Sequence, residues 1–116
     1  MAKYPHEAIF CIVNSGYSEA VMTAAKKFGA RGGTVINARG TASKEAETFF
    51  HITIEPEKEI VMILVPSAIK DKILNALYDE VGLNTAGQGI AFSLPVDSAV
   101  GLNNETLAAP DAETQK

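Results

Sequence analysis

The 116-residue sequence has no tryptophan, only two histidines and only one cysteine. A single cysteine cannot form an internal disulfide, and Cys11 lies within the apolar run 8–13, where a buried and unreactive thiol is expected. His6 and His51 stand in no metal-ligand spacing with Cys11, so no metal ligand is predicted. Because this composition suits a reducing compartment, we expect a cytoplasmic protein.

Basic residues and long apolar runs are also scarce. Ten Lys and Arg stand against fourteen Asp and Glu, which gives a net charge of −4, and the basic residues are scattered along the chain. This pattern argues against DNA or RNA as a partner. No apolar run approaches the roughly 20 residues that span a bilayer, and the first residues lack the order of a signal peptide. We therefore expect a soluble protein, whose partner could still be a membrane protein.

Residues arranged for catalysis are missing as well. The serines stand in no nucleophile-elbow context, so a hydrolase of that kind is not indicated. Glu55, Glu57 and Glu59 surround Pro56 and are interpreted as a solvated charge run, since acid–base chemistry would need a shielded pocket. The sequence therefore predicts no catalytic residue, and we expect a protein that is not an enzyme.

The chain does contain ample apolar material. Hydrophobic residues make up 47% of it, enough for one packed core in a single domain. Short apolar and β-branched runs predict four strands, the third of them broken near Pro56, at residues 8–13, 34–38, 50–65 and 90–96. Because Pro95 cannot donate a ladder hydrogen bond, the last strand should lie at a sheet edge or be irregular at this residue.

Apolar residues at helical spacing predict two helices between these strands. Ser18 and Ser67 are expected as their N-caps, and Gly29 and Gly82 as their ends. The polar, aperiodic residues 103–116 predict a disordered tail behind a single domain of residues 1–102. The resulting order βαββαβ is that of an α+β ferredoxin-like fold with a four-stranded antiparallel sheet.

Two helices can cover only one face of such a sheet. The first and third strands carry apolar side chains on both faces, and the set assigned to the uncovered face consists of Phe10, Ile12, Val61, Ile63 and Val65. A contiguous apolar patch of several hundred Å² is unusual on a monomer, so this face is predicted to pack against other copies of the chain. The pattern alone does not choose between a dimer and a trimer.

The order and spacing of several motifs resemble the PII signalling proteins. One motif is the run from Ile52 to Pro66, a long strand that ends in Val-Pro and leads to a helix. The run from Thr85 to Phe92 follows, with a Gly-x-Gly turn before the last strand. Together with Gly33-Thr34-Val35, which enters a strand ending at Arg39-Gly40, the resemblance covers about residues 7–102.

The resemblance implies a homotrimer with three clefts between subunits that bind a small-molecule effector. The implied effector is an adenine nucleotide, with ATP, ADP and AMP as candidates, with or without Mg. A T-loop at about residues 40–48 is implied to dock onto a target protein such as a membrane transporter, with nitrogen regulation as the implied pathway. The loop residues implied to contact this partner are Thr41, Ser43, Lys44, Glu45 and Glu47.

The resemblance also implies a nucleotide-binding site. The turn Gly87-Gln88-Gly89 corresponds to the B-loop of the family, and glycine lets backbone N–H groups approach a phosphate closely. Arg39 and Gly40, at the base of the T-loop, are implied to lie near the phosphates, where a guanidinium suits phosphate geometry. Thr34 is implied to approach the adenine, and Leu64 to line its pocket.

The sequence departs from the family pattern at three points. Ile90 replaces the lysine that follows the B-loop, residues 98–102 lack a basic pair, and the short loop has no tyrosine to accept uridylylation. These departures indicate a divergent member whose ligand carries fewer phosphates than ATP or is not a nucleotide. Two alternatives stay open: a CutA-like trimeric metal-binding or stress protein, and a structural trimer without a ligand.

Overall fold

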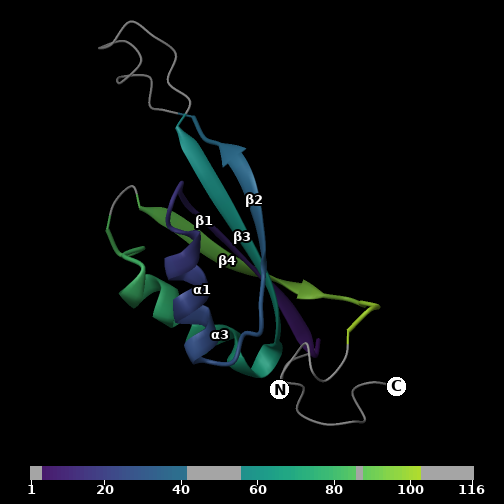
Figure 1. Cartoon of the computed structure of the whole chain (residues 1–116). Coiled ribbons are helices and arrows are strands. Elements are labelled where there is room, and N and C mark those ends of the chain that lie inside the picture. The colour runs from purple at the N-terminus through teal and green to yellow at the C-terminus, as the bar shows by residue number, and fades with distance from the viewer. Residues whose placement is uncertain (1–3, 42–55, 86–87, 103–116) are drawn as a thin grey trace, which may run out of the picture.

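The computed structural model describes residues 4–41, 56–85 and 88–102. Its elements, in chain order, are β1 (His6–Asn14), α1 (Ser18–Lys27), β2 (Thr34–Arg39), β3 (Glu57–Pro66), α3 (Ser67–Glu80) and β4 (Gly89–Val96). This order confirms the predicted ferredoxin-like α+β fold (Figure 1). The predicted tail, and residues 50–55 of the predicted third strand, lie outside the described residues.

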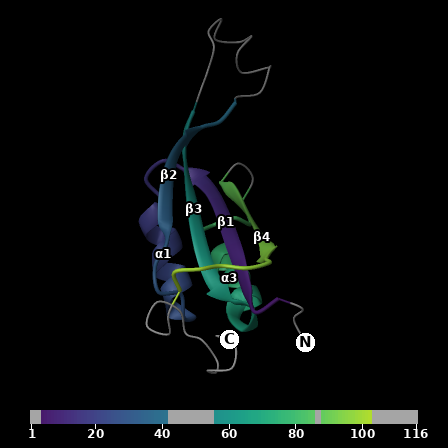
Figure 2. The same ribbon diagram turned by 90° about the vertical axis from the view of Figure 1, so that its right-hand side faces the viewer.

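The four strands form one antiparallel sheet in the order β2-β3-β1-β4. The two most apolar strands, β1 and β3, are central, and Pro95 lies on the edge strand β4, as predicted. Both helices cover the same side of the sheet, so the view in Figure 2 shows the strands in front and the helices behind them. The side without helices is called the open face.

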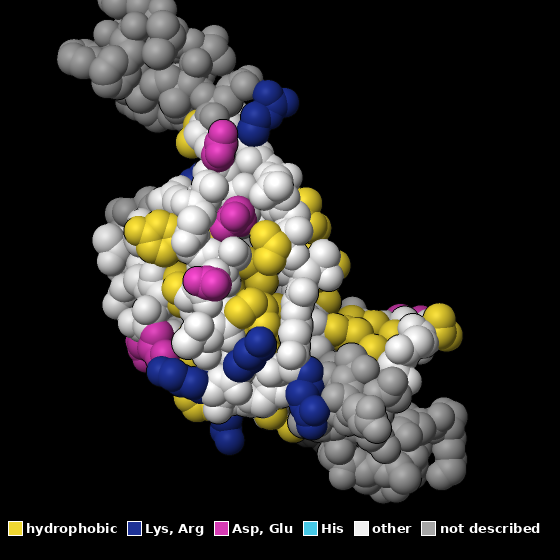
Figure 3. All heavy atoms as spheres, viewed as in Figure 1, with side chains coloured by type: hydrophobic (Ala, Val, Ile, Leu, Met, Phe, Trp, Pro, Cys, Tyr) yellow, Lys and Arg dark blue, Asp and Glu magenta, His cyan; other side chains and the backbone are white. Residues whose placement is uncertain are grey.

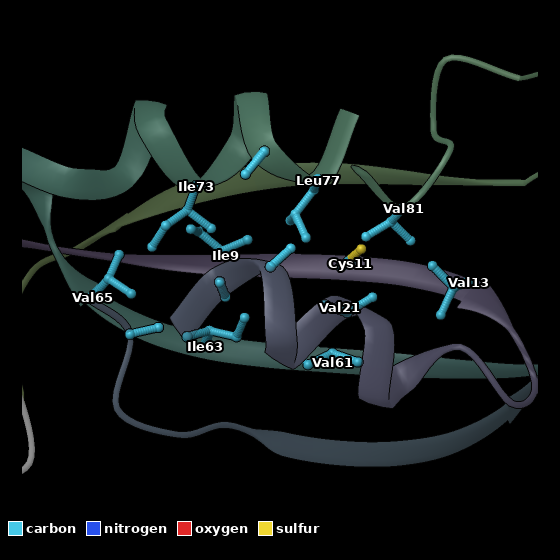
Figure 4. Close-up of a cluster of buried hydrophobic side chains, with 14 residues drawn as sticks. Ile9, Cys11, Val13, Val21, Val61, Ile63, Val65, Ile73, Leu77 and Val81 are labelled. Carbon is cyan, nitrogen blue, oxygen red and sulfur yellow. The ribbon is translucent and has the colours of Figure 1, made fainter. Parts of the chain in front are cut away.

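The strand register sorts side chains between the two faces by residue number. His6 lies opposite Pro66 in β3 and Val96 in β4, and Thr34 lies opposite Met62, so even-numbered residues always pair with even-numbered ones. Because successive side chains in a strand alternate between faces, all odd positions point to the helices. The odd positions of β1 and β3 build the core with α1 and α3 (Figure 4): Ile9, Cys11, Val13, Val61, Ile63 and Val65.

The predicted composition of the open face was therefore wrong in part. Phe10 and Ile12 do lie on it, but Val61, Ile63 and Val65 are fully buried under the helices. The reason is the register, which places Phe10 opposite Met62. Continuous apolar runs carry no sign of which residues share a face. The apolar side chains of the open face include Ala8, Phe10, Ile12, Ile36, Ile60, Met62, Leu64, Ile90, Phe92 and Leu94.

The predicted serine caps were also wrong, because both serines are helical residues. At α1 the N-cap position belongs to Tyr17, and the carboxylate of Glu59 accepts hydrogen bonds from the backbone N–H groups of Gly16 (3.1 Å) and Ser18 (3.2 Å). Glu59 is thus a remote cap that suits the positive end of the helix dipole, and not a solvated charge.

At the start of α3, Ser67 ties the helix to the N-terminal segment. Its hydroxyl donates to the carbonyl of Tyr4 (2.5 Å) and its backbone N–H donates to the carbonyl of Pro5 (2.8 Å). The predicted helix ends are confirmed, since Gly29 and Gly82 follow the two helices with φ of 113° and 88°. These left-handed conformations favour glycine.

Candidate functional site

Four strand ends meet at the end of the sheet that carries residues 40–56. The register places Asn14 opposite Lys58, Arg39 opposite Glu57, and Val13 opposite Gly89. We call this region the loop end; it comprises residues 13–15, 37–40, 56–59 and 88–90 (Figure 1). The fold therefore brings Arg39 and Gly40 to the same end of the sheet as Gln88 and Gly89, although the two pairs of residues are far apart in sequence.

Glycine is required sterically at position 89. Its φ is 149°, and a Cβ atom built there would lie 2.3 Å from the carbonyl oxygen of Ile12, which belongs to the neighbouring strand. Backbone atoms cannot yield easily to such a contact, so the turn must approach β1 as bare main chain. This contact explains why glycine stands at position 89; that the turn cradles a phosphate stays a prediction, and Gly87 lies outside the described residues.

A chain of polar side chains crosses the loop end. The ammonium of Lys58 donates to Asn14 Oδ1 (2.6 Å), and Asn14 Nδ2 donates to Gln88 Oε1 (3.5 Å). The stem of Lys58 also lies against Gly40, where a Cβ atom would be 3.1 Å from Lys58 Cε. Sequence reasoning missed Asn14 and Lys58, because the only visible signal was the turn-forming character of residues 14–16.

An open pocket of about 650 Å³ lies beside these hydrogen-bonded side chains, with Lys58 in its lining. Its lining carries cationic, anionic and amide groups, from Ser15, Asn37, Ala38, Arg39, Glu57 and Lys58. Arg39 is exposed at the end of β2, and the backbone N–H of Gly40 donates to the carbonyl of Pro56 (2.8 Å), which closes the ladder at the loop base. The two cations make the pocket suitable for a small anion.

Two predicted site residues lie away from the loop end. Thr34 and Leu64 are on the open face, opposite Met62 and Ala8. Leu64 is six residues along β3 from Lys58, which corresponds to about 20 Å of strand. A single chain therefore does not gather all the predicted nucleotide-binding residues around one ligand.

Of the predicted partner-binding residues, Thr41 is described and exposed, and Ser43, Lys44, Glu45 and Glu47 lie outside the described residues. His51 lies outside them too. In the described part of the chain no three His, Cys, Asp or Glu side chains group as a metal site would require. None of its helices is long and apolar enough to cross a membrane.

The surroundings of Cys11 account for its expected inertness. The side chain is fully buried, and burial raises the pKa of its thiol from 9.0 to about 11. Because the thiolate is the nucleophile and the metal ligand, Cys11 is unreactive near neutral pH.

Comparison with known proteins identifies the family. The family model described as nitrogen regulatory protein P-II matches residues 7–106, and the chain belongs to this family. The match confirms the resemblance found in the sequence, and it supports a PII-like signalling role. A comparison with curated proteins finds no match.

Solved structures share the fold at low sequence identity. PII from Arabidopsis thaliana, bound to citrate, has a TM-score of 0.63 and 23% identity, covering 81% of this chain and 77% of that one. A PII-like signalling protein from Thermus thermophilus has a TM-score of 0.61 and 22% identity, covering 80% and 87%. A nitrogen regulatory PII-like protein from Thiomonas intermedia, bound to ADP, AMP and bicarbonate, has a TM-score of 0.63 and 15% identity, covering 85% and 98%.

Proposed function

We propose that this protein is a non-catalytic PII-like regulator that senses a small metabolite, with an adenine nucleotide as the first candidate. It works as a homotrimer, binds the effector in clefts between neighbouring subunits, and acts on a target protein through residues 40–48. The observation that carries the proposal is the loop end, where the open pocket lined by Arg39 and Lys58 and the bare backbone of Gly89 lie at the same end of the sheet.

The open face supports the assembly. Four of its apolar side chains remain substantially exposed in the single chain, namely Ile36 (42%), Ile90 (57%), Phe92 (40%) and Leu94 (50%). Charged side chains are instead scattered over the side that carries the helices (Figure 3). An apolar sheet face of this extent is a surface that other copies of the chain would cover.

A cleft between subunits would also complete the site. Thr34 and Leu64 lie on the open face, about 13 and 20 Å of strand away from the loop end. In a closed symmetric assembly the open face of one subunit can approach the loop end of the next. The adenine would then contact Thr34 and Leu64 of one subunit, while its phosphates face Gly89 and Arg39 of the other.

The ligand's charge should be modest. Ile90 is 57% exposed beside Gly89, in a position where a cation could have met a phosphate. At the loop end Glu57 lies opposite Arg39, which offsets part of the positive charge. ADP and AMP, which are bound to the Thiomonas intermedia relative, are therefore better candidates than ATP.

Thermal unfolding with a panel of ligands tests the proposal. ATP, ADP, AMP, cyclic nucleotides, 2-oxoglutarate and bicarbonate are added with and without Mg²⁺, and at least one nucleotide should raise the midpoint because it binds only the folded state. The Arg39→Ala variant should lose this shift, and Arg31→Ala, which removes an exposed arginine outside the loop end, should keep it. No response of the wild-type protein to any nucleotide would refute the nucleotide-sensing role, and an unchanged response in Arg39→Ala would refute the role of Arg39.

The pathway and the target protein are proposed from the family to which the chain belongs. Nitrogen regulation is the first pathway to test, and a membrane transporter is one kind of target. Co-purification from cell extract should depend on the part of this segment beyond Gly40. A chain with residues 41–48 replaced by a short glycine-serine linker, which keeps Gly40, should fold and bind nucleotide but capture no target. Equal capture by both chains would place the contact elsewhere.

A further inference from the structure

We propose that Asn14 is a positioning residue that couples the glycine turn at Gln88 to the loop base at Gly40, through Lys58. The proposal rests on the proposed function for its consequence in ligand sensing. Its structural part stands on the contacts of Asn14 alone.

The place of Asn14 in the sheet makes it a bridge. It is the last residue of the central strand β1, with β3 on one side and β4 on the other. Asn14 lies opposite Lys58 in β3, and its neighbour Val13 lies opposite Gly89 in β4. A side chain at this position can therefore contact both the loop base and the turn.

The carboxamide of Asn14 matches its two neighbours chemically. Its oxygen accepts from the Lys58 ammonium at 2.6 Å, and its NH₂ group donates to the Gln88 carbonyl oxygen at 3.5 Å. Asparagine carries both an acceptor and donors, so it can serve both partners at once. A leucine of similar size could serve neither of them.

The two contacts of Asn14 differ in length. The bond to Lys58 is charge-assisted and short, whereas 3.5 Å is long for an N–H···O hydrogen bond. The contact with Gln88 is therefore the weaker of the two, and the coupling acts equally in both directions. When a phosphate draws the turn toward itself, Gln88 shifts against Asn14, and Asn14 carries the shift to Lys58.

Lys58 passes the shift to the loop base by direct packing. Its stem lies against Gly40, the residue whose N–H closes the β2–β3 ladder on Pro56. Gly40 is also the first residue of the segment proposed to contact the target. Binding of a ligand at the turn is thereby transmitted to Gly40 at the loop base.

A cycle of stability measurements tests the link without any ligand. Gln88→Leu, Lys58→Met and the double variant are unfolded with urea, once with Asn14 present and once with Asn14→Leu. With Asn14 present, the effects of the two substitutions on stability should be non-additive, by about threefold in the unfolding equilibrium constant. With Asn14→Leu, the two effects should be additive. Equal coupling in both series, or additivity in both, would overturn the link.

The functional part is tested by the reactivity of Lys58. Acetylation of each lysine is followed by mass spectrometry with and without ADP, and ADP should change the rate at Lys58 by about threefold in the wild-type protein. In Asn14→Leu this change should disappear although ADP still binds. Asn14→Asp, whose carboxylate can accept from both Lys58 and the Gln88 amide, should keep it. Persistence of the full ADP response in Asn14→Leu would show that the ligand reaches Lys58 directly and would overturn the coupling.

Ser67→Ala is the matched control, because it removes a half-buried hydrogen bond at the opposite end of the sheet. It should lower stability without altering the ADP response of Lys58. If no nucleotide binds the wild-type protein, the proposed function fails, and the stability cycle alone decides whether Asn14 links the turn to the loop base.

Discussion

Introducing a single charge on the open face, at Leu94, should dissociate the proposed trimer into monomers. Leu94 lies on this face in β4, opposite Ala8, and at the far end of the sheet from Gly89. It is 50% exposed in the single chain. Replacing it with glutamate therefore leaves the core under the helices and the loop end intact.

The cost to assembly can be worked from this exposure. Full burial of a leucine contributes about 1.5–3 kcal/mol, so the exposed half of Leu94 contributes about 1 kcal/mol per subunit when another copy covers it. A buried carboxylate without a partner adds about 3–5 kcal/mol. The total, about 5 kcal/mol per subunit, corresponds to more than about a thousandfold in the association constant.

Light scattering after size exclusion at micromolar concentration measures the outcome. The wild-type protein should elute with the mass of a trimer, and Leu94→Glu should elute as a folded monomer, verified by circular dichroism. Tyr78→Glu is the control, because Tyr78 is 55% exposed on α3, on the opposite side of the molecule, and its substitution should leave the trimer intact. A monomeric wild-type protein, or a Leu94→Glu variant that remains trimeric, would refute the account of the open face.

Three further predictions concern the single chain. Gly89→Ala should lower the free energy of unfolding by about 3 kcal/mol and abolish nucleotide binding, because its Cβ would collide with the Ile12 carbonyl; urea unfolding within about 0.5 kcal/mol of wild type would contradict this. Glu59→Ala should lower the free energy of unfolding by about 2 kcal/mol, because it removes the remote cap of α1. Glu59→Gln keeps an acceptor oxygen and should lose about half of that, so equal losses in the two variants would show that only the charge of Glu59 stabilises the helix. Burial raises the pKa of Cys11 from 9.0 to about 11, so the unfolded chain loses the thiol proton first, and the free energy of unfolding should fall by about 2 kcal/mol from pH 9 to 11. Cys11→Ala should lack this part of the fall, and parallel wild-type and variant profiles would contradict it.

The element order was predictable because each element carries a local signal. Alternating or continuous apolar runs, helical spacing and the glycines at helix ends act within a few residues of one another, so pattern alone locates them. The edge position of β4 followed from Pro95 in the same way. Local signals failed where the outcome depends on pairing, as at Val61 and Ile63, whose face is set by the register with β1.

The candidate site was predictable only where residue type and position between strands suffice. Gly89 and Arg39 could be identified by residue type and by their place between strands. Glu59 caps a helix whose first residue lies 41 residues earlier in the chain, and Asn14 contacts a side chain 74 residues later. Contacts at such separations depend on the assembled sheet, and no local pattern reports them.

The central claim is that an adenine nucleotide binds between subunits, and one calorimetric titration tests it most directly. ADP is titrated into the wild-type protein and into the Leu94→Glu monomer under identical conditions. The wild-type trimer should bind one ADP per subunit, and the folded monomer should show no binding, because Thr34 and Leu64 are then missing from the cleft. Equal binding by trimer and monomer would contradict the intersubunit site, and no binding of ADP by the wild-type trimer would contradict ADP as its ligand.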